Sequence, residues 1–118
     1  MRKHSVTPLE EMEIEFLDKT LLFRFDMQAI LKMQNEFGDL KSISEKNSEC
    51  ELVAIMLYSG LKNGDITLDE ARVIISSNAL ILADTLDITL KSLEVLGGQE
   101  VAKKMKEELA GLQIRTQK

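Results

Sequence analysis

The sequence contains one cysteine, one proline, one histidine and no tryptophan among its 118 residues. A single cysteine excludes an internal disulfide and is typical of a protein from a reducing compartment. We expect Cys50 to be a small core or boundary residue. The hydrophobic content of 44% and the near absence of proline are typical of one domain with one hydrophobic core, so we assign residues 1–118 to a single domain.

A basic cluster without acidic neighbours and a long apolar run are also missing, since Lys103, Lys104 and Lys106 lie among glutamates. The net charge is −5, from 15 basic and 20 acidic residues, whereas a nucleic-acid-binding protein needs a clustered basic surface. The apolar run Leu52–Tyr58 has seven residues, whereas a helix that crosses a bilayer needs about 20. The first residues include no apolar segment of the kind that secretion signals carry. We therefore expect a cytosolic protein that binds neither nucleic acid nor membrane.

Residue patterns of catalysis are equally scarce. His4, the only histidine, lies in a terminal segment without the neighbours that a base or a metal ligand needs. Cys50 lacks a histidine partner, the chain offers no Ser, His and Asp set, and no glycine-rich phosphate-binding loop is present. We expect no enzymatic activity and no cofactor.

A calcium loop is the strongest metal-binding candidate. Positions one and three of such a loop would be Ser59 and Leu61, so two expected carboxylates are missing. One bidentate glutamate cannot hold the ion, and we interpret the stretch as an ordinary connection between two helices without a metal. The residues that do match an EF-hand, at positions five, six, eight, nine and twelve, are Asn63, Gly64, Ile66, Thr67 and Glu70.

The run Leu52–Tyr58 leaves no polar face on a helix, which predicts that this helix is the buried centre of the domain. Ser48 and Glu51 form a capping-box pattern that starts the helix. Asn63-Gly64-Asp65 supplies residues of the kind that end helices. The predicted core residues of this region are Leu52, Val53, Ile55, Met56, Leu57 and Leu61.

The N-terminal part predicts a short β-hairpin over residues 12–25. Residues 1–6 carry no pattern and are expected to be loosely ordered. Apolar and polar residues alternate over 12–16, and apolar residues recur at every second position again at Leu21, Phe23 and Phe25. Thr7-Pro8-Leu9-Glu10 favours a short turn of helix before the hairpin. An isolated hairpin is barely stable in water, so this one must pack on helices or pair with another chain, as in a homo-oligomer.

Residues 26–96 predict a helical core that begins at Asp26, a good N-cap. Gly38 is suited to end the first helix, and residues 39–47 suit a loop or a single helical turn. The expected buried stripe of this helix is Met27, Ile30, Met33 and Phe37.

Two more helices are expected before Gly97-Gly98. Thr67 and Glu70 repeat the capping pattern, and the helix that follows carries Ala71, Val73, Ile74 and Ile75 in a buried setting. A long helix should then run from Ala79 to Leu96. Its expected wet edge is formed by Asp84, Asp87, Lys91 and Glu94.

Residues 99–112 predict an amphipathic helix after Gly97-Gly98, and residues 113–118 a tail. Its apolar stripe is narrow, and its lysines are interspersed with glutamates as on a solvated helix face. The helix either packs on its own domain or binds a partner. Our hypothesis for a partner-binding site is the apolar stripe of this helix. The stripe consists of Val101, Met105, Leu109 and Leu112.

Taken together, these patterns predict a mainly α, or α+β, fold: a small single-domain helical bundle with a short N-terminal β-hairpin. The order of signals between Ile14 and Leu96 resembles the tail assembly chaperones of long-tailed phages and gene transfer agents. The resemblance is carried by Phe23-Arg24-Phe25-Asp26-Met27, Phe37-Gly38-Asp39, the helix Ala54–Leu61 and Ile66-Thr67-Leu68-Asp69-Glu70.

This resemblance implies a small, mainly helical protein that binds the tape-measure protein and keeps it soluble until the tail tube polymerises around it. It also implies a location in the cytoplasm of the bacterial host and absence from the mature virion. In many such phages a ribosomal frameshift yields a longer form, and this chain would be the shorter product. The alternative function is a small helical adaptor or regulatory protein-binding module with another partner.

Overall fold

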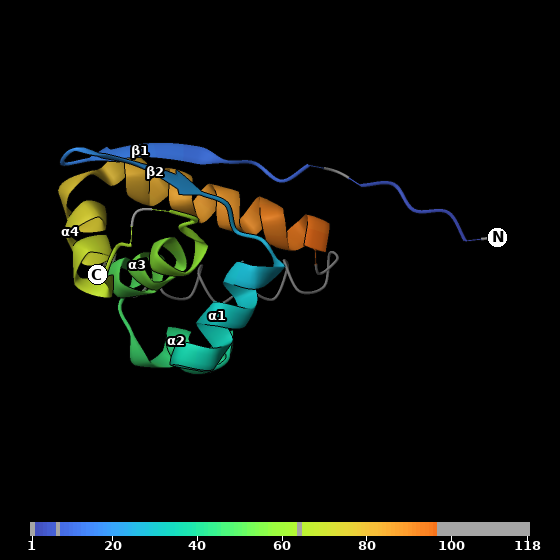
Figure 1. Ribbon diagram of the computed structural model, residues 1–118. Coiled ribbons are helices and arrows are strands. Elements are labelled where there is room, and N and C mark those ends of the chain that lie inside the picture. Colours follow the sequence, from blue (N-terminus) through green and yellow to red (C-terminus); the bar gives the residue numbers. More distant parts are fainter. Residues whose placement is uncertain (1, 7, 64, 97–118) are drawn as a thin grey trace.

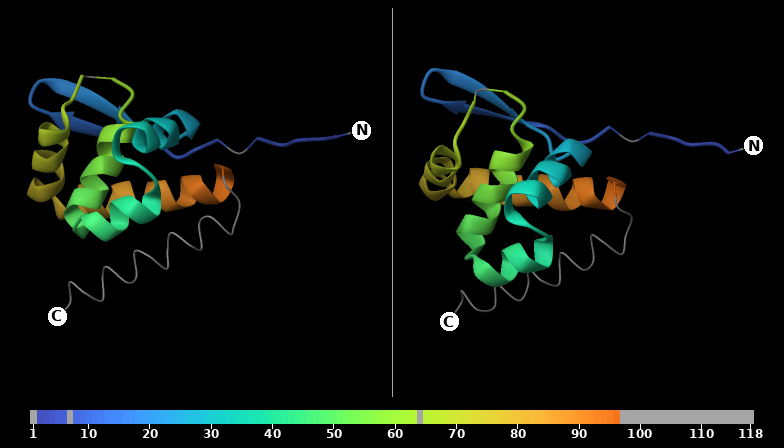
Figure 2. Two further views of the ribbon diagram at one scale, coloured as in Figure 1. Left: turned by 90° about the horizontal axis from the view of Figure 1, so that it is seen from below. Right: turned by 60° about the horizontal axis from the view of Figure 1, so that its bottom comes forward.

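A computed structural model describes residues 2–6, 8–63 and 65–96. It confirms the predicted fold class, because the described residues form helices and one antiparallel two-stranded hairpin. Residues 2–6 extend away from the helices, as Figure 2 shows. The elements in chain order are β1 (Met12–Phe16), β2 (Lys19–Phe23), α1 (Met27–Phe37), α2 (Leu40–Lys46), α3 (Glu49–Gly60), α4 (Leu68–Ser77) and a final helix, Ala79–Leu96.

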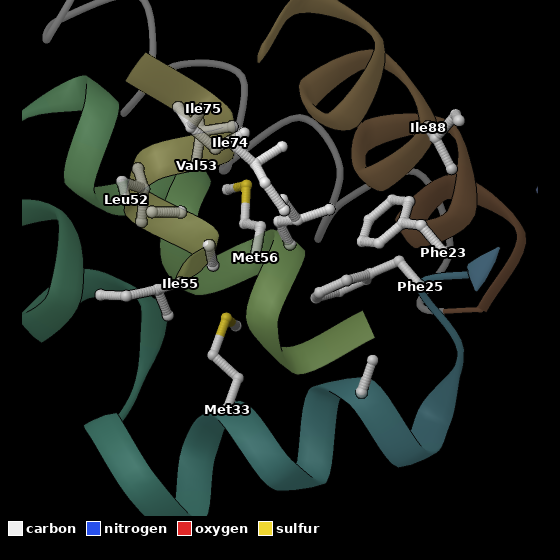
Figure 3. Close-up of a cluster of buried hydrophobic side chains, with 14 of the residues drawn as sticks. Phe23, Phe25, Met33, Leu52, Val53, Ile55, Met56, Ile74, Ile75 and Ile88 are labelled. Atoms are coloured by element: carbon white, nitrogen blue, oxygen red, sulfur yellow. The ribbon is translucent and has the colours of Figure 1, made fainter. Parts of the chain in front are cut away.

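Helix α3 lies at the centre of the described structure, as its sequence predicts (Figure 1). Ser48 caps it by accepting a hydrogen bond from the backbone N–H of Glu51, and every side chain from Leu52 to Leu57 is buried. Because no face of the helix is polar, neighbours must cover all of it. Figure 3 shows the side chains that converge on α3 from β2, the segment after it, α1, α4 and the final helix, among them Phe23, Phe25, Met33, Ile74, Ile75 and Ile88.

The hairpin packs on the helices, with its register running from Met12 opposite Phe23 to Phe16 opposite Lys19. Ile14, Leu21 and Phe23 are buried on its inner face. The edge of β2 that does not pair with β1 forms hydrogen bonds with the chain that follows α3. Lys62 N donates to Leu22 O at 2.9 Å, and the Asn63 side chain both accepts from Leu22 N and donates to Thr20 O. The hairpin is therefore anchored to its own domain within the described residues.

The predicted helix boundaries at Asp26, Gly38 and Thr67 are confirmed. The Asp26 carboxylate accepts from Ala29 N at 3.0 Å, and Gly38 ends α1 with a φ of 98°, which favours glycine. Thr67 and Glu70 form a complete capping box at the start of α4. The predicted wet edge of the final helix is exposed, and Lys91 pairs with Asp87 there at 3.1 Å.

Three local predictions about element boundaries were wrong. Residues 39–47 form a seven-residue helix, α2, because Asp39 supplies an N-cap to Ser42 N at 2.8 Å. Pro8–Glu11 is not helical; the Glu10 and Glu11 carboxylates instead pair with Lys91 and Arg24. Helix α3 ends at Gly60, before Asn63, since the next residues bond to β2.

Several predictions of burial were also wrong. Met27, placed in the stripe of α1, is 51% exposed, and Ala29 is buried in its place. Val73 on α4 is 52% exposed, and Cys50 at the start of α3 is exposed as well. Leu61 is half-buried, although the other five predicted core residues of α3 are buried. Each of these residues sits at an end or at an edge of an apolar stripe, where sequence spacing alone does not fix the orientation.

No single helix in the described part of the chain is long and apolar enough to cross a membrane. Helix α4 and the final helix reach that length and composition only as a pair, across a bend of 114°. Both contribute to the core, with Ile74, Ile75, Ile88 and Leu93 buried.

Shortening a side chain of α3 tests the central position of this helix. Leu57→Ala should lower the free energy of unfolding by about 2 to 5 kcal/mol, because Leu57 is fully buried and the cavity it leaves cannot close. Leu80→Ala is the matched control, since Leu80 is 76% exposed and its loss should cost less than about 0.5 kcal/mol. Equal values for the two variants in urea unfolding would refute the central burial of α3.

The contact between Gly60 and Phe23 gives a second test. A Cβ on Gly60 would lie 2.4 Å from Cε1 of the buried Phe23 ring, so Gly60→Ala should cost about 1 to 3 kcal/mol through steric overlap. Phe23→Leu should cost less in the Gly60→Ala background than in the wild type, because the smaller side chain relieves the overlap. Additive effects in a double-mutant cycle would contradict the close approach.

Candidate binding site

A surface cavity of about 470 Å³ lies where α3 ends and α4 begins. Its walls come from α1, from the end of α3, from the connecting segment and from the first turn of α4, so it joins parts of the chain that are distant in sequence. Its volume falls in the range of about 300 to 1,000 Å³ that ligand sites occupy. The lining residues are Lys32, Tyr58, Leu61, Lys62, Asn63, Asp65, Ile66, Thr67 and Leu68.

One wall of the cavity is held in place by a set of aromatic and charged contacts. The Lys32 ammonium lies 4.1 Å from the centre of the Tyr58 ring, a cation–π contact. Tyr58 packs edge-on against Phe37, with ring centres 6.0 Å apart, and its hydroxyl donates to Glu36 at 3.1 Å. Burial, followed by the neighbouring Glu36 carboxylate, raises the pKa of Tyr58, so the phenol stays protonated as a donor at neutral pH.

Lys62, another lining residue, is held by an ion pair with Asp26, the N-cap of α1. Lys62 Nζ lies 2.6 Å from Asp26 Oδ1, and both side chains are less than a fifth exposed. The same carboxylate accepts from Ala29 N and contacts Arg24 Nε at 3.4 Å. Burial acts to raise the pKa of Asp26, but the hydrogen bonds from Lys62, Ala29 N and Arg24 outweigh it and hold the pKa below its ordinary value.

The connecting segment is shaped by its bonds to the hairpin and to α4. Asn63 is fixed to β2 through Leu22 and Thr20, and Asp65 adopts a φ of 47°, in the left-handed region. The Thr67 backbone N–H donates to Glu70 Oε1 at 3.2 Å. The cavity therefore has a framework built from backbone bonds and caps rather than from mobile side chains alone.

A smaller hollow of about 280 Å³ lies beside Cys50, between α3 and α4. Arg72 pairs there with Glu51 at 2.8 Å and also with Asp69, so its guanidinium is already engaged. Glu51 is thereby drawn away from the capping box expected with Ser48, of which only the Ser48 half forms. The hollow is therefore a surface feature of the contact between α3 and α4, whose charged side chains are already paired with one another.

Metal-binding groups are not assembled in the part of the chain that the structure describes, where no cluster of three or more His, Cys, Asp or Glu side chains is placed to hold an ion. Glu70, the last position of the EF-hand pattern, belongs to the capping box of α4. His4 is exposed in the extended N-terminal segment. Around the cavity, Leu61, Ile66 and Leu68 supply apolar side chains, and Lys32 and Lys62 supply ammonium groups.

The sequence-based prediction placed the partner-binding site elsewhere. The stripe Val101, Met105, Leu109 and Leu112 lies outside the described residues. Sequence reasoning missed the cavity, because Lys32 and Tyr58 had no shared pattern. Tyr58 could have indicated the site, because it ends the apolar run and its hydroxyl group needs a hydrogen-bond partner when it is buried.

Comparisons of the chain with protein-family models, with curated proteins and with solved structures find no match.

The Asp26 carboxylate should make stability depend on pH. Because its pKa is lower in the folded state, its contribution is complete above the ordinary value of 3.8 and is lost as the pH falls through the native value. Asp26→Asn keeps a good N-cap but removes the charge, and should cost about 1 to 3 kcal/mol at pH 7. The difference from the wild type should shrink in acid.

Thermal unfolding at pH 7 and at successively lower pH measures this difference. Asp84→Asn, on the exposed edge of the final helix, is the control and should leave stability within about 0.5 kcal/mol. A gap between wild type and Asp26→Asn that stays constant down to the most acidic pH would show that the ionised carboxylate contributes nothing.

Proposed function

We propose that this chain is a phage tail assembly chaperone that binds the tape-measure protein and keeps it soluble during assembly of the tail tube. It acts in the cytoplasm of the bacterial host and is absent from the mature virion. The proposal rests on the resemblance of its sequence motifs to that family and on the way those motifs meet in space.

One observation carries the proposal: the separate segments that resemble the family all converge where α3 ends. Phe23 packs against Gly60, and Asp26 binds Lys62. Phe37 packs against Tyr58, and Ile66, Thr67 and Leu68 line the cavity. Motifs scattered over the chain thus meet at the end of α3, beside the cavity.

The surface of α1 supports a helical partner. Met27 and Leu31 are one helical turn apart and are 51% and 54% exposed. Such a pair offers apolar area to an amphipathic or apolar helix, and methionine adapts its shape to the surface it meets. An adaptor with another protein partner would use the same surface, so the identity of the partner is the point to test.

Co-expression with the tape-measure protein of the same genome tests the function directly. The tape-measure protein should be insoluble when expressed alone and soluble, in a complex that co-purifies, when this chain is present. An unrelated helical protein of similar size and charge serves as the control. A tape-measure protein that is equally soluble without this chain would remove the proposed function.

Substitutions on the predicted stripe test where the partner binds. Met105→Ser together with Leu109→Ser should weaken the complex through loss of apolar burial, by about 2 kcal/mol or more, and leave thermal stability little changed. Lys103→Ser with Glu107→Ser, which a helical period of 3.6 places opposite the stripe, is the matched control. Loss of stability before loss of binding would mean that the stripe packs on its own domain.

A further inference from the structure

The final helix carries a row of leucines along one border of its buried side. Thr85 and Ile88 are buried, whereas Asp84 and Asp87 are exposed on the other side of the helix. The four leucines are spaced by four, four and three residues, and a period of 3.6 places them on one face. Three of them are only partly buried, so part of this face is uncovered. We call these residues the leucine stripe: Leu82, Leu86, Leu90 and Leu93.

The apolar stripe expected for residues 99–112, here called the terminal stripe, has the same spacing and lies outside the described residues. The two stripes are related by reflection about Gly97-Gly98. Leu86 lies eleven residues before Gly97, and Leu109 lies eleven residues after Gly98. In two antiparallel helices joined at these glycines, each leucine would face a residue of the terminal stripe at the same height, to within one residue or about 1.5 Å. The facing pairs are Leu93 with Val101, Leu90 with Met105, Leu86 with Leu109 and Leu82 with Leu112.

The connection between the two stripes favours a contact within one chain. Two residues suffice to join antiparallel helices, and glycine accepts the backbone conformations that such a tight turn needs. A tethered segment also meets its surface at an effective concentration in the millimolar range, so a modest apolar contact is enough. In this arrangement Lys106 would lie near Asp87 on the exposed border of the contact, where their opposite charges attract.

We propose that residues 99–112 fold back antiparallel along the final helix and cover the leucine stripe with the terminal stripe. This contact is autoinhibitory, because it occupies the side chains that bind the tape-measure protein under the proposed function. The fold-back itself does not depend on that function. Closure is weak, about threefold in favour of the closed state, so it adds little to thermal stability and a partner can open it. The apparent affinity for the partner is then about fourfold lower than that of an open chain.

Disulfide trapping in the full-length chain tests the fold-back. Cys50 is first changed to serine, because it is exposed and is the only native cysteine. In this background Leu86→Cys with Leu109→Cys brings two thiols together within the contact, so oxidised glutathione should close a disulfide within the chain. Asp84→Cys with Ala110→Cys is the matched control. These two positions have nearly matching heights, but a helical period places them on the outer sides of the two helices.

Two further pairs test the register. Leu90→Cys with Met105→Cys is a second matched pair, whereas Leu86→Cys with Met105→Cys is displaced by about one helical turn. Both matched pairs should cross-link at least about tenfold faster than the displaced pair and the outer control, as mass spectrometry of unreduced peptides measures. Thermal unfolding of the reduced variants establishes that each is folded.

Equal rates for all pairs would overturn the fold-back. Disulfides that join two chains, in place of those within one chain, would show that a second copy covers the leucine stripe. That result also overturns the fold-back.

The locked chain tests autoinhibition. Leu86→Cys with Leu109→Cys, closed by its disulfide, should bind the tape-measure protein at least about tenfold more weakly than the same chain after reduction, because the lock keeps the terminal stripe occupied. Equal binding before and after reduction would overturn the autoinhibition and leave the fold-back and the chaperone function in place. Failure of the wild type to bind would overturn the proposed function and the autoinhibition with it, while the trapping rates would still decide the fold-back.

Discussion

The constraint on which the structure depends is that α3 has no polar face. Its side chains from Leu52 to Leu57 are all buried, so the rest of the chain must surround one helix. Helices α1 and α4 and the side chains of the hairpin supply that cover.

The cavity lies at the end of α3, where the elements that cover this helix meet. The absence of a side chain at Gly60 lets the Phe23 ring approach closely, and Arg24 N donates to Gly60 O at 3.0 Å. The chain then runs beside β2 before α4 begins, and this detour leaves a hollow that neither α1 nor α4 fills. The contacts that anchor the hairpin thus also border the cavity. Lys32 and Tyr58 line it, with the Lys32 ammonium over the Tyr58 ring.

Sequence reasoning succeeded where the cause is local. The caps at Asp26, Ser48 and Thr67 depend on one polar side chain and the N–H groups just after it, so they are readable from sequence. It failed where the cause is tertiary. The orientation of Met27 is set by how α1 packs on α3, and the early end of α3 is set by its bonds to β2. The cavity belongs to this second kind, since Lys32 and Tyr58 meet only in the folded chain.

Hydrogen exchange measured by mass spectrometry, on the free protein and on its complex with the tape-measure protein, tests the central claim most directly. The proposed partner would contact the cavity and the exposed side of α1. Binding there should slow exchange in peptides from α1 and from the segment between Tyr58 and Leu68, and leave exchange in α2 unchanged. Unchanged exchange between Tyr58 and Leu68 in a stable complex, with protection found elsewhere, would contradict it.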